Sequence, residues 1–295
     1  MTQQGFVTGW LKSNGIRMHY LDWTQGRDVS GSVPIVALHG MASSAHWYNL
    51  TLPHLADDFS TYALDQRAHG QTDQPSEGYD WHTLATDVVG ALDALGLDQA
   101  ILLGHSWGGN TALAVAAHFP SRVERLVLID GGFFSRIPNM EWEEYKNRLS
   151  PRDIYGPKER YLGTLRRQFE RVWSDELEQM LMTMPEIDEQ GIVSERLRPE
   201  NHEQILRAMF FDPLGERYAD IRCPTLIVAA SPRETPENAN FVRRRREMVG
   251  GAEAGILESR VHWVADSGHD IGYEKPHELA HVIGNFARAA SGPGG

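Results

Sequence analysis

The sequence contains a single cysteine, Cys223, so no disulfide can form within the chain. It also lacks an apolar run of the ~20 residues that a helix needs to cross a bilayer. The first ten residues, MTQQGFVTGW, show neither the charged start nor the apolar stretch of a signal peptide. These absences predict a soluble protein of the reducing cytoplasm that does not associate with membranes.

Basic residues are also few, with 28 lysines and arginines against 40 aspartates and glutamates and a formal net charge of -12. A field of this sign repels phosphate groups, so nucleic acids and anionic membrane surfaces are not expected as partners. One basic run, Arg243 to Arg246, is an exception, and in an acidic chain such a run is typical of a solvated helix face. The sequence leaves the oligomeric state unknown.

Short apolar runs alternate with longer stretches of helical pattern, which predicts an α/β fold with a mostly parallel sheet covered by helices. Two early runs, at about 5–12 and 16–23, meet at Asn14 and Gly15, a pair typical of a tight hairpin turn. The sheet should therefore begin with an antiparallel pair. Further buried strands are expected at 34–40, 61–65, 100–106, 124–130 and 224–230. Helices are expected at about 79–95, 107–119 and 234–249, and from Pro276 onward.

Between residues 131 and 219 the strand pattern stops, and charged, aromatic and methionine-rich segments with helical spacing take over. We therefore expect an α/β core formed by 1–130 and 220–295, with a helical cap inserted at 131–219. Most large apolar side chains of the cap should pack against the core, while a minority line a substrate pocket. The large apolar residues of the cap, taken together, are Phe133, Phe134, Trp142, Tyr145, Tyr155, Tyr161, Phe169, Trp173, Met180, Met182 and Met184.

The clearest chemical signal is the sequence GHSWGG at 104–109, which follows a predicted strand and precedes a predicted helix. A serine at such a sharp turn adopts a strained backbone conformation, and the glycines let the strand and the helix approach closely. The pattern G-x-S-x-G is weak alone, but this context makes Ser106 the expected nucleophile.

A serine hydroxyl needs a base to remove its proton, and histidine has a suitable pKa. His269 lies in the turn DSGHD, between a late strand pattern and the final helix, and is the expected base. The developing negative charge needs two backbone donors. We expect these to be the N–H of Trp107 and, from the loop after strand 34–40, that of Met41.

The segments LHGMASSAHWY, ALDQRAHGQTDQP, LLGHSWGG, LVLID and SGHDIGYEKP resemble successive landmarks of the α/β-hydrolase family. The resemblance covers residues 34–130 and 220–290, and it implies an eight-stranded sheet, a variable cap and a Ser, acid, His triad in chain order. Members that dehalogenate or open epoxides resemble this chain but carry aspartate where it has Ser106. The cap carries no landmark that identifies a substrate.

The position of the acid departs from the common pattern of the family. Most members that resemble this chain place an aspartate after the strand matched here by 224–230, where this sequence has Pro232. Two carboxylates remain as candidates, Glu234 nearby and Asp130 at the end of LVLID. Adjacent parallel strands deliver their carboxyl ends to the same edge at ~4.8 Å spacing, which favours Asp130. A glutamate such as Glu234 is also expected simply at the first turn of the next helix.

A second motif, His277-Glu278-Leu279-Ala280-His281, matches the H-E-x-x-H signature of zinc proteases. A catalytic zinc needs a third protein ligand, and Ala287 stands where the extended motif has histidine. Apolar residues fall on one side of this predicted helix, so an amphipathic closing helix with surface histidines is the simpler interpretation. We expect no metal site.

These observations predict a serine hydrolase that cleaves a carboxylic ester through an acyl-enzyme, without a cofactor. The expected partner is a small-molecule substrate with an apolar acyl or aromatic part. Lactones, thioesters and carbon–carbon bonds are cleaved by similar machinery, so they remain alternatives. A slowly reacting ligand receptor on the same fold is an alternative of a different class.

Overall fold

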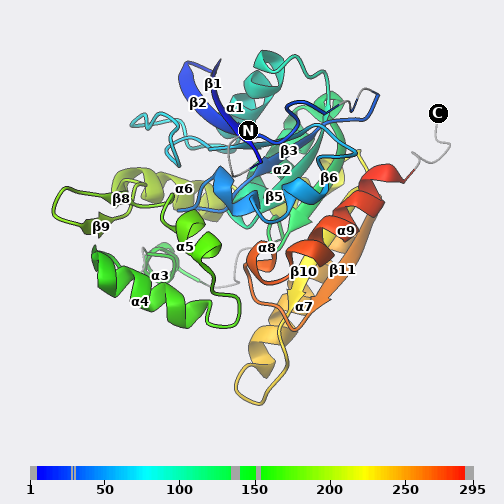
Figure 1. The fold of residues 1–295 in the computed structure, drawn as a ribbon. Coiled ribbons are helices and arrows are strands. Elements are labelled where there is room, and N and C mark those ends of the chain that lie inside the picture. The colour runs from blue at the N-terminus through cyan, green and yellow to red at the C-terminus, as the bar shows by residue number, and fades with distance from the viewer. Residues whose placement is uncertain (1–4, 28, 30, 134–139, 151–153, 290–295) are drawn as a thin grey trace.

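The computed structural model describes residues 5–289 apart from 28, 30, 134–139 and 151–153. Its centre is an eight-stranded sheet in the order β1-β2-β4-β3-β5-β6-β10-β11, shown in Figure 1. The pairs β1–β2 and β2–β4 are antiparallel, and all other neighbours are parallel. The expected mostly parallel sheet is therefore confirmed. Its strands are Val7–Ser13 (β1), Ile16–Asp22 (β2), Ile35–Leu38 (β3), Thr61–Leu64 (β4), Ala100–His105 (β5), Val123–Ile129 (β6), Thr225–Ser231 (β10) and Ser259–Ala265 (β11).

The opening hairpin turns at Asn14 and Gly15, as the sequence predicts. Both residues have positive φ, 47° and 81°, which is the conformation that the two central residues of a type I′ turn require. Glycine adopts it without a steric penalty and asparagine with a small one.

Helices cover both faces of the sheet. Because side chains alternate along a strand, Val36 and Leu38 of β3 join one apolar cluster while Ile35 and Ala37 join the other. The first cluster takes apolar side chains from α1 (Trp81–Ala94), α2 (Trp107–His118) and α7 (Ala239–Gly255). The second takes them from α8 (Ile271–Glu274) and α9 (Pro276–Arg288). Both faces of the central strands are thus buried, as their uninterrupted apolar runs predict.

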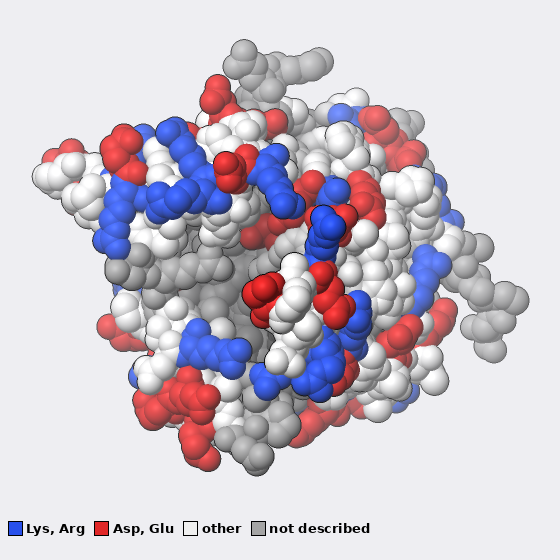
Figure 2. Space-filling model, turned by 90° about the horizontal axis from the view of Figure 1, so that it is seen from below, with Lys and Arg blue, Asp and Glu red and all other residues white. Residues whose placement is uncertain are grey.

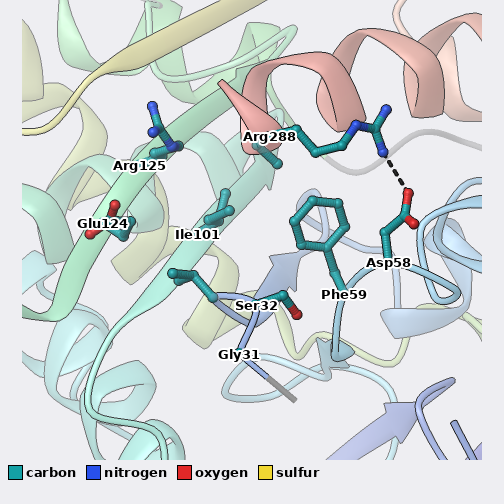
Figure 3. A pocket seen from close by; sticks show the side chains of 10 residues that line it. Gly31, Ser32, Asp58, Phe59, Ile101, Glu124, Arg125 and Arg288 are labelled. Atoms are coloured by element: carbon teal, nitrogen blue, oxygen red, sulfur yellow. Dashed lines mark hydrogen bonds and ion pairs between the residues drawn. The ribbon is translucent and has the colours of Figure 1, made fainter. Parts of the chain in front are cut away.

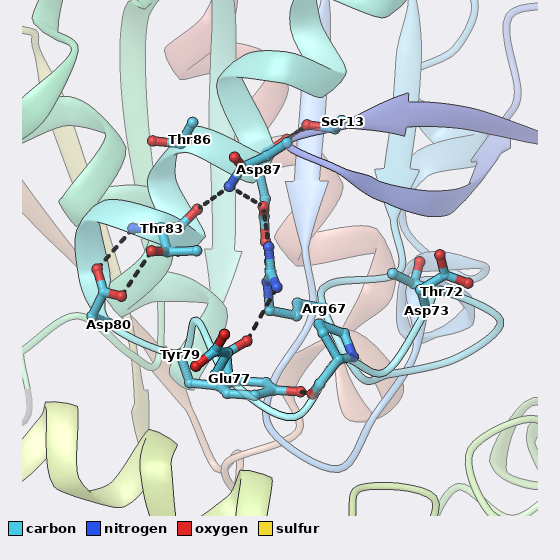
Figure 4. A network of polar contacts seen from close by, with 12 residues as sticks. Ser13, Arg67, Thr72, Asp73, Glu77, Tyr79, Asp80, Thr83, Thr86 and Asp87 are labelled. Carbon is cyan, nitrogen blue, oxygen red and sulfur yellow. Dashed lines mark hydrogen bonds and ion pairs between the residues drawn. The ribbon is translucent and has the colours of Figure 1, made fainter.

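A buried ion pair ties α1 to the loop that follows β4 (Figure 4). The Arg67 guanidinium donates from Nε and Nη2 to the two Asp87 carboxylate oxygens, at 2.7 and 2.8 Å. The hairpin is joined to the same helix, because Asn14 donates to the Asp87 carboxylate at 2.8 Å and Ser13 to the Asp87 carbonyl at 2.6 Å. The bonds between Arg67 and Asp87 therefore hold the loop after β4 against α1.

The insertion between β6 and β10 contains α3 (Trp142–Arg148), α4 (Lys158–Gln168), α5 (Asp175–Leu181) and α6 (Pro199–Phe211), which lie together at the left of Figure 1. The sequence predicted helices here but missed a three-stranded antiparallel sheet in the order β7-β9-β8. Its strands are Gly156–Pro157 (β7), Glu186–Ile187 (β8) and Ile192–Ser194 (β9), and strands of two or three residues are too short to show an alternating pattern. The division into core and cap stays a prediction, and Phe134 lies outside the described residues.

Among the helices of the described chain, none is long and apolar enough to cross a membrane. Acidic and basic side chains are closely interspersed on the face seen in Figure 2. Residues of both charges are therefore mixed on that face, although the whole chain is strongly acidic.

Candidate active site

Ser106 lies at the turn between β5 and α2, where the sequence predicts it. Its φ of 53° and ψ of -121° lie outside the helical and extended regions. The flanking glycines explain how the turn closes: a Cβ on Gly104 would lie 2.2 Å from the Gly108 carbonyl oxygen, and one on Gly108 would lie 2.2 Å from that of Leu38. The close approach of strand and helix therefore requires glycine at both positions.

The structure brings Ser106, His269 and Asp130 together from three separate loops. His269 Nε2 lies 2.9 Å from Ser106 Oγ, and His269 Nδ1 lies 2.6 Å from Asp130 Oδ2. Asp130 directly follows β6, which pairs in parallel with β5, and His269 lies between β11 and α8. With its proton on Nδ1, the imidazole donates to the carboxylate and accepts from the hydroxyl. This chain of hydrogen bonds is able to withdraw the serine proton.

The Asp130 carboxylate is fully buried and has three partners. Besides His269, its Oδ1 accepts from the Ala230 N–H at 2.9 Å and contacts Nη2 of Arg245, a buried residue of α7. Burial by itself raises the pKa of this carboxyl, but the hydrogen bond from His269 and the charge of Arg245 outweigh it and hold the pKa below its usual range. Asp130 is therefore ionised at neutral pH.

The His269 side chain is 42% exposed, so a ligand can reach it from solvent. Its burial favours the neutral ring, yet the hydrogen bond to Asp130 and the charges of Asp130 and Asp270 prevail and raise the pKa above its ordinary value. His105, directly before Ser106, supports the loop: its Nε2 lies 3.0 Å from the His269 carbonyl oxygen, and its ring stacks on Trp47. Burial lowers the pKa of His105 to about 4, so this ring is neutral.

Glu234, the other candidate acid, has different neighbours. Its side chain is half exposed and lies 3.2 Å from the guanidinium of Arg246. The next helix, α7, begins at Ala239, so the expectation that this helix begins at 234 and takes Glu234 into its first turn is wrong. Asn238 is the residue directly before this helix. Its side chain accepts a hydrogen bond from the Thr235 N–H and donates one to the Arg233 carbonyl. These bonds hold residues 233–238 in a loop.

Left-handed backbone conformations accumulate around these residues. Ser106 and Asp130 have φ values of 53° and 43°, and Ala42 and Asp266, in the two loops beside them, have 56° and 51°. Non-glycine residues adopt this region rarely, at a cost on the order of 1–3 kcal/mol each. The backbone of the site is therefore strained at several points.

The loop after β3 passes directly over Ser106. A Cβ on Gly40 would lie 3.1 Å from the Ser106 Cβ, so this glycine allows the loop to come close. Met41 follows Gly40, and Trp107 begins α2, where the first N–H groups have no acceptor within the helix. Both predicted donors thus belong to segments that adjoin Ser106, and their role in holding an oxyanion stays a prediction.

Buried side chains from the segment after β4 hold this loop. His69 Nε2 accepts from the Ala42 N–H at 3.0 Å while its Nδ1 donates to the Arg67 carbonyl at 2.8 Å. Asp65 Oδ1 accepts from the Ala45 N–H at 2.6 Å. Burial lowers the pKa of His69 to about 3, which keeps Nε2 free of a proton and able to accept. This support has no local signal in the sequence, because the bonds to Ala42 and Ala45 join residues 27 and 20 positions apart.

The histidines of the H-E-x-x-H motif lie on the exposed side of α9. His281 contacts Asn285, and Glu278 contacts His262 rather than a motif histidine. Leu279, Ile283 and Phe286 are buried, which confirms the amphipathic helix. Within the described residues, no three histidine, cysteine or acidic side chains lie close enough to hold a metal ion.

Two pockets differ in their relation to Ser106. A small one adjoins the loop after β3: it is lined by Ala42, Ser43 and His69 from one side and by Tyr155, Met184 and Glu195 of the insertion from the other. Burial raises the pKa of Glu195 to about 7. Of the large apolar residues noted in this insertion, Tyr155 and Met184 line this pocket.

A larger pocket lies at the opposite edge of the sheet (Figure 3). Ile101, near the start of β5, lines it together with Arg125 and the ion pair between Asp58 and Arg288. Ser106 stands five residues further along the strand, which corresponds to roughly 16 Å. The larger pocket is therefore not the site of the serine chemistry.

Comparisons with known proteins agree with this fold. A profile of a family described as alpha/beta hydrolase fold matches residues 33–276. The AB hydrolase superfamily protein YisY of Bacillus subtilis (strain 168) is 28% identical over 271 residues, covering 89% of this chain and 94% of that protein. The soluble epoxide hydrolase of Corynebacterium sp. (strain C12) is 38% identical over 117 residues, which cover 40% of this chain and only 39% of that relative.

Solved structures show the same architecture at low sequence identity. That of E-2-(acetamidomethylene)succinate hydrolase is similar with a TM-score of 0.74 and 22% identity, covering 95% of this chain and 98% of that chain. The enol-lactonase from Burkholderia xenovorans LB400 gives a TM-score of 0.67 at 20% identity, with 94% and 99% coverage. These likenesses establish the fold and leave the substrate open.

Proposed function

Because this chain belongs to the alpha/beta hydrolase fold family, we propose that it is a serine hydrolase that cleaves carboxylic esters through an acyl-enzyme. One observation carries the proposal: His269 Nε2 lies 2.9 Å from Ser106 Oγ while its Nδ1 lies 2.6 Å from Asp130. This is the order of nucleophile, base and orienting acid that acyl transfer requires.

In the proposed reaction, His269 removes the hydroxyl proton as Ser106 Oγ attacks the ester carbonyl. Asp130 stabilises the imidazolium that forms, and the N–H groups of Met41 and Trp107 hold the negative charge of the tetrahedral intermediate. His269 then gives its proton to the leaving alcohol. In the second half, the same base activates water, which releases the acid and restores Ser106.

The substrate is proposed to be a small molecule with an apolar acyl or aromatic part, supported by Tyr155 and Met184 beside the loop that carries Met41. Lactones and thioesters undergo the same attack and remain within this proposal as alternatives, as does carbon–carbon cleavage. Epoxide opening is disfavoured although an epoxide hydrolase is among the relatives. Family members with that activity resemble this chain but have an aspartate in place of Ser106.

A series of p-nitrophenyl esters from acetate to dodecanoate tests the proposal. We expect steady release of nitrophenolate over many turnovers, with kcat/KM varying along the series as the apolar pocket fills. A single stoichiometric burst without further turnover would instead favour a slowly reacting receptor. The proposal fails if no ester, thioester or lactone is hydrolysed and a fluorophosphonate probe does not label Ser106.

The support of the loop after β3 leads to a further expectation. His69→Phe keeps an aromatic ring but removes the acceptor of the Ala42 N–H, so the Met41 N–H shifts relative to Ser106. Displacements of about 1 Å at a reacting centre cost roughly 100-fold, so we expect kcat to fall by about 10- to 100-fold with little change in KM. Steady-state kinetics on the preferred ester checks this.

His82→Phe is the matched control, since this exposed histidine of α1 contacts His118 and Phe119. It should leave kcat unchanged. If His69→Phe also leaves kcat unchanged, the loop does not depend on this hydrogen bond.

A further inference from the structure

Arg245 lies inside the protein although its neighbours in the basic run do not. Its side chain is 6% exposed, whereas those of Arg243 and Arg246 are 65% and 60% exposed. Residues three and seven apart lie on one side of a helix, and Val242 and Val249 of α7 are buried together with Arg245. The expectation of a solvated helix face for 243–246 is thus wrong for this one residue.

The guanidinium of Arg245 is directed at the candidate acid. Its Nη2 contacts Asp130 Oδ1, and its Nε donates to the Ala230 carbonyl at 2.9 Å. The N–H of the same alanine donates to Asp130 Oδ1 at 2.9 Å. Ala230, at the end of β10, therefore binds the carboxylate through its N–H and the guanidinium through its carbonyl oxygen. The ring of Phe241, 5.6 Å from Cζ, packs against the cation as well.

This arrangement compensates for the position of the acid. A fully buried carboxylate is costly unless it has an opposite charge and enough hydrogen bonds. Most family members that this chain resembles carry their acid after the strand matched by β10, where this chain has Pro232. Here that strand contributes only backbone groups, and α7, which follows it, contributes the positive charge.

We propose that Arg245 is a positioning residue that fixes the Asp130 carboxylate and whose charge keeps His269 unprotonated, and therefore able to act as a base, at lower pH. The proposal rests on the proposed function, since it assigns His269 the role of base. It adds a fourth residue to the three whose chemistry the sequence predicts.

The sign of the effect follows from the charges that face His269. Asp130, from the end of β6, and Asp270, on the same loop, favour the protonated imidazole, and Arg245, from α7, opposes it. Glu274 of α8 binds the Gly268 N–H, and His105 of β5 is neutral above about pH 4. Removing Arg245 leaves the negative charges unopposed, so the pair of Asp130 and His269 binds its proton more tightly. The acidic limb of the pH profile then moves to higher pH.

Arg245→Met is the test, because it retains a long apolar stem without the charge. On the acidic limb we expect kcat/KM for the preferred ester to fall about tenfold relative to wild type, with a smaller loss at alkaline pH. Arg245→Lys keeps the charge and should return the limb most of the way toward its wild-type position. Arg246→Met removes an equal charge from the same helix at a distance from Asp130, and its profile should coincide with that of wild type.

A substrate-free measurement separates this proposal from the proposed function. The imidazole of His269, titrated by NMR in wild type and Arg245→Met, should show a higher pKa in the variant. If the shift is found but no substrate is hydrolysed, the proposed function fails and the placement of Arg245 stands. If Arg245→Met folds, hydrolyses the ester and keeps the wild-type limb and titration, the proposal is overturned. Should that variant not fold, Arg245→Lys with a wild-type profile supports the proposed charge effect, and a displaced limb contradicts it.

Discussion

Ser106→Ala is expected to lower kcat by roughly 10⁴- to 10⁶-fold, because the acyl-enzyme cannot form without the Ser106 oxygen. The residual rate would come from the backbone donors and from substrate binding alone. The fold should persist, since Ser106 Oγ makes no capping hydrogen bond to α2 and instead bonds to His269. Burst and steady-state measurements on the preferred p-nitrophenyl ester, together with a thermal unfolding curve, check both statements.

Ser32→Ala is a suitable control for this experiment. Ser32 lies at the larger pocket, at the opposite edge of the sheet, where its hydroxyl donates to the Val29 carbonyl. Its loss should leave kcat within about twofold of wild type, as expected of a surface change away from the site. Near-wild-type hydrolysis by Ser106→Ala would end the interpretation of Ser106 as nucleophile.

Asp130→Asn should cause the second largest loss, on the order of 10³- to 10⁴-fold in kcat. The amide would present a donor or a neutral acceptor to His269 Nδ1, so the imidazole loses the partner that fixes its tautomer and stabilises its charged form. Arg245 would also lose its counter-ion within the protein. A single-turnover assay with the activated ester reports the chemical step directly.

Glu234→Gln is the paired measurement, because Glu234 is the other acid that the sequence allows. Its carboxylate lies at Arg246 on the surface, and exposed ion pairs contribute little. We expect kcat to change by less than about twofold. The opposite order, with Glu234→Gln the impaired enzyme, would show that Asp130 is not the acid.

The sheet and Ser106 were predictable because their signals are local. Each central strand contains a short apolar run, and Asn14 with Gly15 specifies its turn without help from distant residues. The same holds for the turn at Ser106, which depends on two glycines of one short segment. Gly104 packs against Gly108, and Gly108 packs against the end of the neighbouring strand at Leu38. The three-stranded sheet of the insertion is the converse case, since its strands are too short to show a pattern of their own and β7 pairs with β9 across about 35 residues of chain.

The surroundings of the site were less predictable because they depend on contacts between distant segments. The choice between Asp130 and Glu234 stayed open in the sequence, and the geometry that favours Asp130 comes from the pairing of β5, β6 and β10. Arg245 carried a readable signal, because it shares a helical face with Val242 and Val249. Its place in a run of four arginines, however, is more typical of a solvated helix face. The bond between His69 and Ala42 has no counterpart in local sequence.

The left-handed residues at Ala42, Ser106, Asp130 and Asp266 bear on how this protein evolves. Since each conformation is disfavoured for a side chain other than glycine, replacement of such a residue by glycine relieves strain. At Ser106 that replacement also removes the proposed nucleophile, whereas at Asp130 it would leave the buried Arg245 without its counter-ion. A laboratory selection for heat resistance alone would therefore enrich inactive sequences at Ser106, whereas selection for turnover retains the less stable residue.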